Sequence, residues 1–283
     1  MSDFLLLIRI SRPRFWIYVL GPFLIGLAAA FRVSGELAHW HILILGIYFT
    51  LPANLLIYGI NDIFDYETDR RNPKKENFEA LVEPDRHNRL FFYIAVINIP
   101  FLLAAAYLGS LLVGISLSCF LLFSVFYSAP PVRSKSKPLL DSAFNILYVF
   151  PGVTAFALIR DDFPPIPVLL AAGLWTMAMH AYSAIPDIEA DKEAGIQTVA
   201  TFLSAKPALL FCTICYLAAA VLSFSPLGFF ALVFGTVYIS MMAASMYASG
   251  RTGLFSIYRK FPIVNTIVGF CIFWIIAFPK IFK

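Results

Sequence analysis

The sequence predicts an all-α protein that crosses a membrane several times, and its composition carries this prediction. Of its 283 residues, 60% are hydrophobic and 13% are charged, about half the charged share of an ordinary globular domain. Phenylalanine alone occurs 29 times. A water-soluble fold of this size cannot bury that much apolar surface. The composition therefore excludes a soluble enzyme, a disordered regulator and a disulfide-stapled secreted domain.

Nine apolar segments are each close to the roughly 20 residues that a helix needs to cross a bilayer. They cover residues 15–31, 41–60, 89–108, 110–127, 140–159, 166–185, 206–224, 227–248 and 262–279. The third and fourth follow each other so closely that we expect antiparallel neighbours. The first segment ends in three alanines, as a cleaved signal peptide does. We expect an uncleaved helix there, because residues 1–14 already contain an amphipathic stretch.

The basic residues predict the orientation, because Lys and Arg are enriched on the cytoplasmic side of membrane proteins. With the N-terminus in the cytoplasm, the outer side keeps four of the 21 Lys and Arg residues, namely Arg32, Arg160, Lys280 and Lys283. The sequence therefore predicts a multi-pass protein of the cytoplasmic membrane with its C-terminus on the outer side. We expect residues 1–283 to form a single membrane domain.

Neither the net charge nor the cysteines indicate a further site. The net charge is +4, and because the basic residues sort by membrane side we expect no nucleic-acid partner. Cys212 and Cys215 form a C-x-x-C pattern, which in a soluble protein indicates redox chemistry or zinc. No polar residues accompany it, so we expect two thiols on a membrane helix.

An acidic segment lies at the cytoplasmic end of the second predicted span. Asp62, Asp65 and Asp69 are spaced i, i+3 and i+7, which places three carboxylates on one face of a helix. Like charges stacked in this way repel, and a divalent cation is the simplest remedy. Carboxylates that leave positions open for substrate phosphates are the usual ligands of Mg²⁺. We therefore expect a magnesium site here.

A second acidic segment lies at the cytoplasmic end of the sixth span. Asp187 and Asp191 are one helical turn apart, whereas Glu189 points elsewhere. Two such helix ends could clamp metal ions and bind the diphosphate of a substrate whose tail lies in the bilayer. Solvated acidic helix ends are the ordinary alternative for either segment alone. The same-face spacing in both segments favours the metal site.

Further polar residues are candidates for binding the substrates. The candidates for the diphosphate are Asn61, Arg70, Lys74, Arg133 and Lys135. Positive-inside topology alone also predicts basic residues in these loops. The candidates for lining the cavity of a lipophilic acceptor are Asn54, Tyr127, Asp141, Asn145 and His180. For each asparagine a hydrogen bond between helices is the alternative.

These residues resemble the UbiA superfamily of intramembrane prenyltransferases. The family's N-D-x-x-D-x-x-x-D is matched by Asn61, Asp62, Asp65 and Asp69, and its D-x-x-x-D by Asp187 and Asp191. The resemblance implies nine helices around a central cavity and Mg²⁺ that bridges both motifs to an allylic diphosphate. The metal and basic residues then stabilise the leaving diphosphate. An electron-rich acceptor from the lipid attacks the allylic cation, and a proton is lost.

Within this family, several stretches are similar to the carotenoid-modifying branch, the lycopene elongases. They include 11–16, 72–75, 127–131, 140–142 and 180–187. Members of this branch add a five-carbon unit from dimethylallyl diphosphate to a long polyene such as lycopene, some with hydration. Many quinone-forming members instead have an Arg-Pro soon after the first motif, which this sequence lacks. A quinone precursor, a chlorin or a lipid remains the alternative acceptor.

Two other classes of membrane protein also carry acidic clusters. The CDP-alcohol phosphotransferases require D-G-x-x-A-R, but Ile63 and Phe64 follow Asp62 here. A cation transporter would place its acids near the bilayer midplane, whereas these cluster at one face. The transporter remains the non-enzyme alternative. The sequence leaves open the final proton acceptor, the donor chain length and the oligomeric state.

Overall fold

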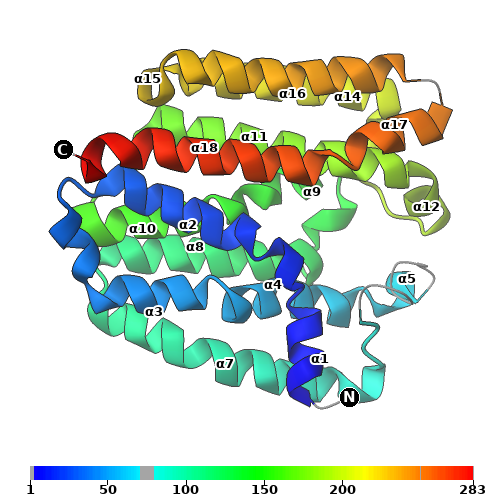
Figure 1. The fold of residues 1–283 in the computed structure, drawn as a ribbon. Helices are drawn as coiled ribbons and strands as arrows, with labels where there is room; N and C mark the ends of the chain where they lie inside the picture. The colour runs from blue at the N-terminus through cyan, green and yellow to red at the C-terminus, as the bar shows by residue number, and fades with distance from the viewer. Residues whose placement is uncertain (1–2, 71–79, 249, 283) are drawn as a thin grey trace. The chain divides into compact units, whose positions relative to one another are not determined.

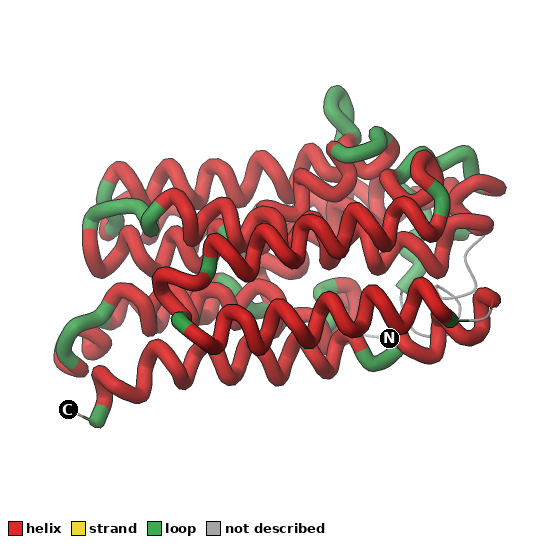
Figure 2. Tube along the Cα trace, turned by 90° about the horizontal axis from the view of Figure 1, so that it is seen from above, coloured by secondary structure: helices red, strands yellow, loops and turns green. Residues whose placement is uncertain are grey.

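The computed structural model describes residues 3–70, 80–248 and 250–282. Throughout these residues the chain forms helices joined by short turns, with no β-strand among them (Figure 2). The chain divides into two compact units. Unit 1 takes residues 1–133, 150–163 and 280–283, and unit 2 takes residues 134–149 and 164–279. Each unit is described by itself.

Unit 1 is a helical bundle in which α10 packs against both α2 and α8, and α4 packs against α7 and α8 (Figure 1). The short helix α1 packs against α4. The helices are α1 (Asp3–Ile10), α2 (Ile17–Ala30), α3 (Trp40–Tyr48), α4 (Leu51–Phe64), α5 (Tyr66–Asp69), α7 (His87–Leu108), α8 (Leu111–Ser128) and α10 (Phe150–Arg160).

A close approach of two glycines joins α2 to α10. A Cβ atom added at Gly26 would lie 2.2 Å from the carbonyl oxygen of Gly152. Only a residue without a side chain fits there, and small residues at helix crossings are the usual means of tight packing in membranes. This contact brings α10 against α2 although more than a hundred residues separate them along the chain.

Unit 2 is built around α14, which packs between α11 and α16. Its buried core includes Tyr182, Tyr216, Tyr238 and Phe261, and the rings of Tyr216 and Tyr238 stack at 4.6 Å. Its helices are α9 (Leu140–Ala143), α11 (Ile166–Ala184), α12 (Ile188–Glu193), α13 (Val199–Leu203), α14 (Ala205–Leu222), α15 (Phe224–Leu227), α16 (Phe229–Tyr247), α17 (Gly250–Tyr258) and the greater part of α18 (Phe261–Ile281). Turns of 3₁₀-helix add η5 (Phe144–Tyr148) and η6 (Ile185–Asp187). Cys212 and Cys215 are buried free thiols on α14, as expected.

The helices confirm a multi-pass membrane protein. The described residues contain eight helical stretches that are long and apolar enough to cross a membrane. A ninth arises if Asp3–Phe15 and Ile17–Ala30, which are bent by 59°, count as one span. Each predicted segment corresponds to one of these stretches, and α7 and α8 are in contact as expected. The orientation of the termini stays a prediction.

Two predicted spans are interrupted where a proline stands inside the apolar segment. The span at 41–60 divides into α3 and α4 before Pro52, and in the span at 140–159 the 3₁₀ turn η5 gives way to α10 directly before Pro151. Proline cannot donate the i to i−4 hydrogen bond, and its ring crowds the preceding turn. Hydropathy alone does not register this effect. Both interruptions lie within the membrane-spanning part of the chain.

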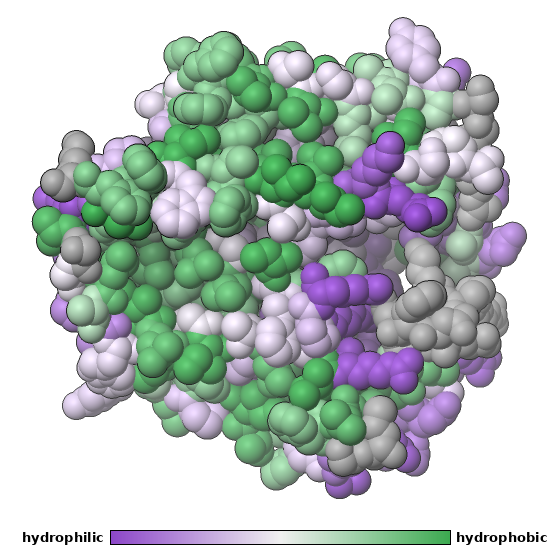
Figure 3. All heavy atoms as spheres, in the orientation of Figure 1, coloured by the Kyte–Doolittle hydropathy of each residue, from purple (hydrophilic) through white to green (hydrophobic). Residues whose placement is uncertain are grey.

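The face of unit 1 drawn in Figure 3 is mostly hydrophobic, as contact with lipid requires. Hydrophilic atoms gather toward the end of this unit that carries α5, which lies at the right of Figure 1. The first acidic motif extends from the end of α4 into α5. The polar chemistry of unit 1 is therefore concentrated at one end of its helices.

Candidate active site

The first acidic motif lies where α4 ends and α5 begins. The sequence predicts Asp62, Asp65 and Asp69 on one face of a helix, and the structure interrupts that helix at one of the three residues. Asp65 stands between the two helices with φ −106° and ψ 3°. Its carbonyl accepts hydrogen bonds from the Asp69 amide at 2.8 Å and from the Thr68 hydroxyl at 2.8 Å. Such local side-chain bonds compete with regular helix.

Asp62 is held by an arginine that the sequence did not single out. Its carboxylate is 2% exposed, and Oδ1 accepts a hydrogen bond from Nη2 of Arg12 at 2.8 Å. The same guanidinium lies 4.5 Å from the centre of the Tyr58 ring, a cation–π contact. A buried carboxylate requires such a partner. Arg12 precedes the first predicted span, and no sequence spacing relates it to Asp62.

Asp65 is fully buried and lies beside one of the predicted basic residues. Nη2 of Arg133 lies 3.7 Å from Asp65 Oδ1, and the Ser128 hydroxyl donates to Asp65 Oδ2 at 3.2 Å. The backbone of Arg133 is left-handed, with φ 43°. The structure therefore brings the loop after α8 to the first motif. Ser128, which precedes this loop, is a contact that the sequence reasoning missed.

The remaining candidates of unit 1 lie around these two aspartates. Arg70 pairs with Glu67 at 3.2 Å on the exposed side of α5. The buried Asn54 donates to the carbonyl of Thr50 at 2.6 Å, a bond within its own segment of chain. Asn61, Asp69 and Tyr127 are half-buried. Lys74 lies outside the described residues.

Tyr66 ties α5 to the segment that precedes α7. Its hydroxyl donates to Oε2 of Glu83 at 2.6 Å. This hydrogen bond raises the pKa of Tyr66, because the carboxylate stabilises the protonated phenol and its charge opposes ionisation. The contact holds the beginning of α5 directly after Asp65.

The second acidic motif follows a change of helix type at the end of α11. Pro186 lies in η6, Asp187 is its last residue, and α12 then carries Asp191. Both aspartates are half-buried. A neighbouring pocket of about 300 Å³ in unit 2 is lined by Glu189 and Lys206 but by neither aspartate. Lys135, the remaining basic candidate, is half-buried in unit 2.

Three of the predicted cavity residues come together in unit 2. Asp141 is fully buried, and its Oδ2 accepts a hydrogen bond from the backbone N–H of Val199 at 2.9 Å. Nε2 of His180 lies 3.6 Å from the same oxygen. Asn145 donates to the backbone carbonyl of Asp141 at 2.8 Å. Asp141 therefore connects α9, α11 and the start of α13.

The donors of both motifs fit a hard divalent cation in kind, since they are carboxylate and amide oxygens. Among the described residues, no group of three or more His, Cys, Asp or Glu side chains is gathered as a complete ion site. Mg²⁺ commonly uses one or two carboxylates and takes its other ligands from water and substrate phosphates. The arrangement is therefore compatible with a metal that arrives with a diphosphate.

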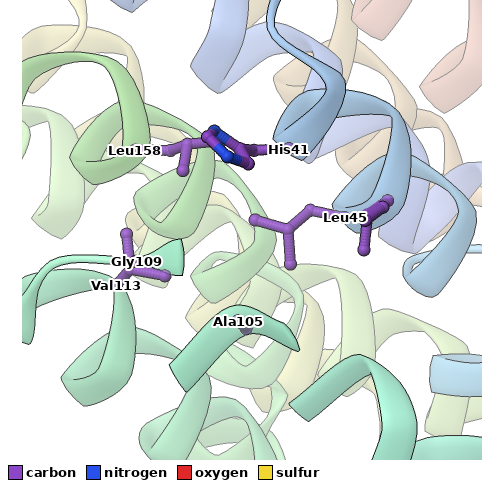
Figure 4. Close-up of a pocket in the computed structure, with 7 residues that line it drawn as sticks. His41, Leu45, Ala105, Gly109, Val113 and Leu158 are labelled. Carbon is purple, nitrogen blue, oxygen red and sulfur yellow. The ribbon is translucent and has the colours of Figure 1, made fainter. Parts of the chain in front are cut away.

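A small pocket in unit 1 is unsuited to the substrates. Figure 4 shows His41 and Leu158 directed toward each other above Leu45 and Ala105. The pocket has room for about one water molecule, with a volume near 10 Å³. Apart from His41, its lining is apolar. A diphosphate has neither space nor cations there.

Comparison with known proteins agrees with this arrangement. The model of the UbiA prenyltransferase family matches residues 19–260. The lycopene elongase/hydratase of Haloarcula japonica is 39% identical over 274 residues, which cover 96% of this chain and 90% of that protein. The lycopene elongase/hydratase of Corynebacterium glutamicum is 34% identical and covers 78% of this chain and 77% of that protein.

Solved structures share the fold. A UbiA homolog from Archaeoglobus fulgidus bound to GPP and Mg²⁺ has a TM-score of 0.70 at 18% identity, covering 96% of this chain and 99% of that chain. The homolog bound to DMAPP and Mg²⁺ has a TM-score of 0.68 at 17% identity, with the same coverage. Taken with the two acidic motifs, these matches show that the chain is a membrane-bound prenyltransferase and belongs to the UbiA family.

Proposed function

We propose that this prenyltransferase transfers a five-carbon dimethylallyl group from dimethylallyl diphosphate to a carotenoid such as lycopene. The observation that carries this proposal is the 39% identity to a lycopene elongase/hydratase over 96% of the chain. A relative from Haloferax volcanii with the same description is 38% identical over 93% of the chain. On this proposal residues 1–283 form a single prenyltransferase domain, which lies in the cytoplasmic membrane.

The aspartates and basic residues act on the donor. Asp62, Asp65, Asp69, Asp187 and Asp191 would hold Mg²⁺ together with the diphosphate. Bound there, Mg²⁺ would supply positive charge to stabilise the leaving diphosphate. Arg133, which lies beside Asp65, adds a cation to the same region. Structural neighbours bound to GPP and Mg²⁺ and to DMAPP and Mg²⁺ support this use of a divalent metal.

The acceptor reaches the enzyme from the lipid. Large apolar side chains are exposed along the helices, as for Leu103, Leu111 and Ile166, so membrane lipid surrounds the spans. A carotenoid dissolved in the bilayer then needs no aqueous path. Exclusion of water protects the allylic cation until the acceptor attacks. A homogentisate phytyltransferase of Synechocystis, 28% identical over 60% of the chain, keeps a quinone precursor as the second candidate acceptor.

The test is expression in a host that accumulates lycopene, followed by chromatography and mass spectrometry of the pigments. We expect the intact chain to produce carotenoids heavier by one or two five-carbon units. Asp65→Asn and Asp187→Asn should abolish the product, because each removes a charged ligand of the metal–diphosphate complex. Glu189→Gln is the matched control, because Glu189 lies between Asp187 and Asp191 and faces another pocket. This control should retain the product.

Two results would contradict the proposal. Near-normal product from either aspartate variant, present in the membrane at the wild-type level, would show that the acidic motifs do not hold the donor. An unchanged pigment profile with the intact chain would contradict a carotenoid acceptor. It would not contradict prenyl transfer to another acceptor. The same membranes would then be supplied with labelled dimethylallyl diphosphate and quinone precursors, chlorins or lipids.

A further inference from the structure

An acid–imidazole pair lies in unit 2, outside the two acidic motifs. Asp141, at the beginning of α9, is fully buried. Its Oδ2 accepts the Val199 N–H at 2.9 Å and lies 3.6 Å from Nε2 of His180 on α11. The His180 side chain is 17% exposed, so the imidazole connects a buried carboxylate to an accessible surface. At 3.6 Å the two groups are beyond hydrogen-bond distance, and they form an ion pair once the imidazole carries a proton.

As a contact between helices, this pair costs more free energy than apolar packing would. Burial of a carboxylate costs several kcal/mol unless its oxygens are all satisfied. No hydrogen bond from the described residues reaches Oδ1 of Asp141. Apolar side chains of similar volume would hold the same helices together at lower cost. The backbone N–H of Val199 keeps the carboxylate from turning, which a positioning role needs and simple packing does not.

The place of His180 along α11 suits the reacting end of the donor. His180 precedes Asp187 by seven residues, about 10 Å along the helix at 1.5 Å per residue. This rise is comparable to the length of a diphosphate with a five-carbon tail. A donor held by its diphosphate near Asp187 therefore extends its prenyl group toward the depth of His180.

We propose that His180, positioned by Asp141, accepts the proton released at the end of the transfer. This inference rests on the proposed function. The allylic C–O bond breaks, and the prenyl carbon forms a bond with a double bond of the acceptor, which leaves a cation on the neighbouring acceptor carbon. An adjacent C–H bond then breaks, its electron pair forms a new double bond, and the proton goes to the imidazole.

The same base serves if water completes the reaction. Water oxygen then bonds to the cation, and its surplus proton goes to the imidazole. A neutral imidazole has one ring nitrogen with a lone pair, and that nitrogen takes up the proton in either case. The Asp141 carboxylate stabilises the imidazolium, which passes its proton to water and resets the enzyme. Asp141 is therefore a positioning residue.

The test measures kcat and the KM for dimethylallyl diphosphate in vesicles that contain Mg²⁺ and lycopene. General-base catalysis contributes roughly 10²–10⁴-fold, so His180→Gln should lower kcat at least about 100-fold with little change in donor KM. Asp141→Asn can still accept the Val199 N–H, and it should lower kcat by a smaller factor. Added imidazole should restore part of the activity of His180→Ala. Thr176→Val is the control, and it should keep the wild-type kcat. The hydroxyl of Thr176 donates only a local hydrogen bond, to the Gly173 carbonyl on the same helix.

Three outcomes would decide against the pair. Wild-type kcat in folded His180→Gln overturns it. If that variant does not fold, wild-type kcat in Asp141→Asn together with no imidazole rescue of His180→Ala overturns it. A raised donor KM at unchanged kcat would make His180 a donor-binding residue and also overturn it. A folded wild-type chain that transfers no prenyl group to any acceptor would instead refute the proposed function, and the inference with it.

Discussion

At the scale of single residues, the site is governed by how buried carboxylates obtain partners. Asp62 and Asp65 carry the same charge and lie three residues apart, yet one pairs with Arg12 and the other with Ser128 and Arg133. The spacing of these acids is local, so the sequence alone predicts that they share a site, and their role stays a prediction. The sequence did not predict Arg12, because its pairing with Asp62 depends on where the segment after α1 crosses α4.

Arg12→Ala should destabilise the protein strongly. Removing one partner of a buried ion pair leaves the other charge uncompensated and costs about 3–5 kcal/mol. We expect a clearly lower unfolding temperature in detergent, and partial recovery in the Arg12→Ala/Asp62→Asn double variant. Arg14→Ala is the control, because Arg14 is exposed and stacks on Phe15 at 4.6 Å. Equal unfolding temperatures for Arg12→Ala and Arg14→Ala would refute the role of this ion pair.

At the scale of helices and turns, hydropathy predicted where the spans lie but not how they end. The apolar segments matched the helices because burial in lipid depends on composition. The breaks at Pro52, Asp65 and Pro151 arise from backbone hydrogen bonding, which hydropathy does not report. The same holds for η6, which changes the helix type directly before Asp187. Each acidic motif therefore includes a junction between helices. At a junction a carboxylate side chain is not restricted to the directions that a regular helix imposes.

The crossing of α2 and α10 should be intolerant of a single methyl group. Gly26→Ala would place a Cβ 2.2 Å from the Gly152 oxygen, so one helix must move. Overpacking of this kind costs typically about 1–3 kcal/mol. Gly114→Ala on α8 is the matched control, because its added Cβ would meet no described atom within 4 Å beyond its chain neighbours and the nearby backbone of α8. Thermal unfolding should show a lower midpoint for the first variant and an unchanged or higher one for the second. Identical midpoints would mean that the helices do not touch there.

At the scale of the whole molecule, the sequence accounted for the class of protein better than for its contacts. The apolar segments and the two acidic motifs each follow from patterns within one stretch of the sequence. By contrast, the hydrogen bond between Asp141 and the Val199 amide joins residues 58 positions apart in the sequence, and the one between Arg12 and Asp62 joins residues 50 positions apart. Such pairings depend on which helices are neighbours, and one sequence does not display neighbours.

The orientation of the chain is testable with single cysteines in a variant that lacks the four native ones. Val33 is 61% exposed in the segment predicted to lie outside, and Glu189 is exposed in the segment predicted to face the cytoplasm. In intact cells, a membrane-impermeant maleimide should label Val33→Cys but should label Glu189→Cys only after permeabilisation. The physical reason is the positive-inside rule, since translocation of a segment rich in Lys and Arg is unfavourable. The reverse labelling pattern would place both acidic motifs on the outer face, where a diphosphate donor made in the cytoplasm does not reach them.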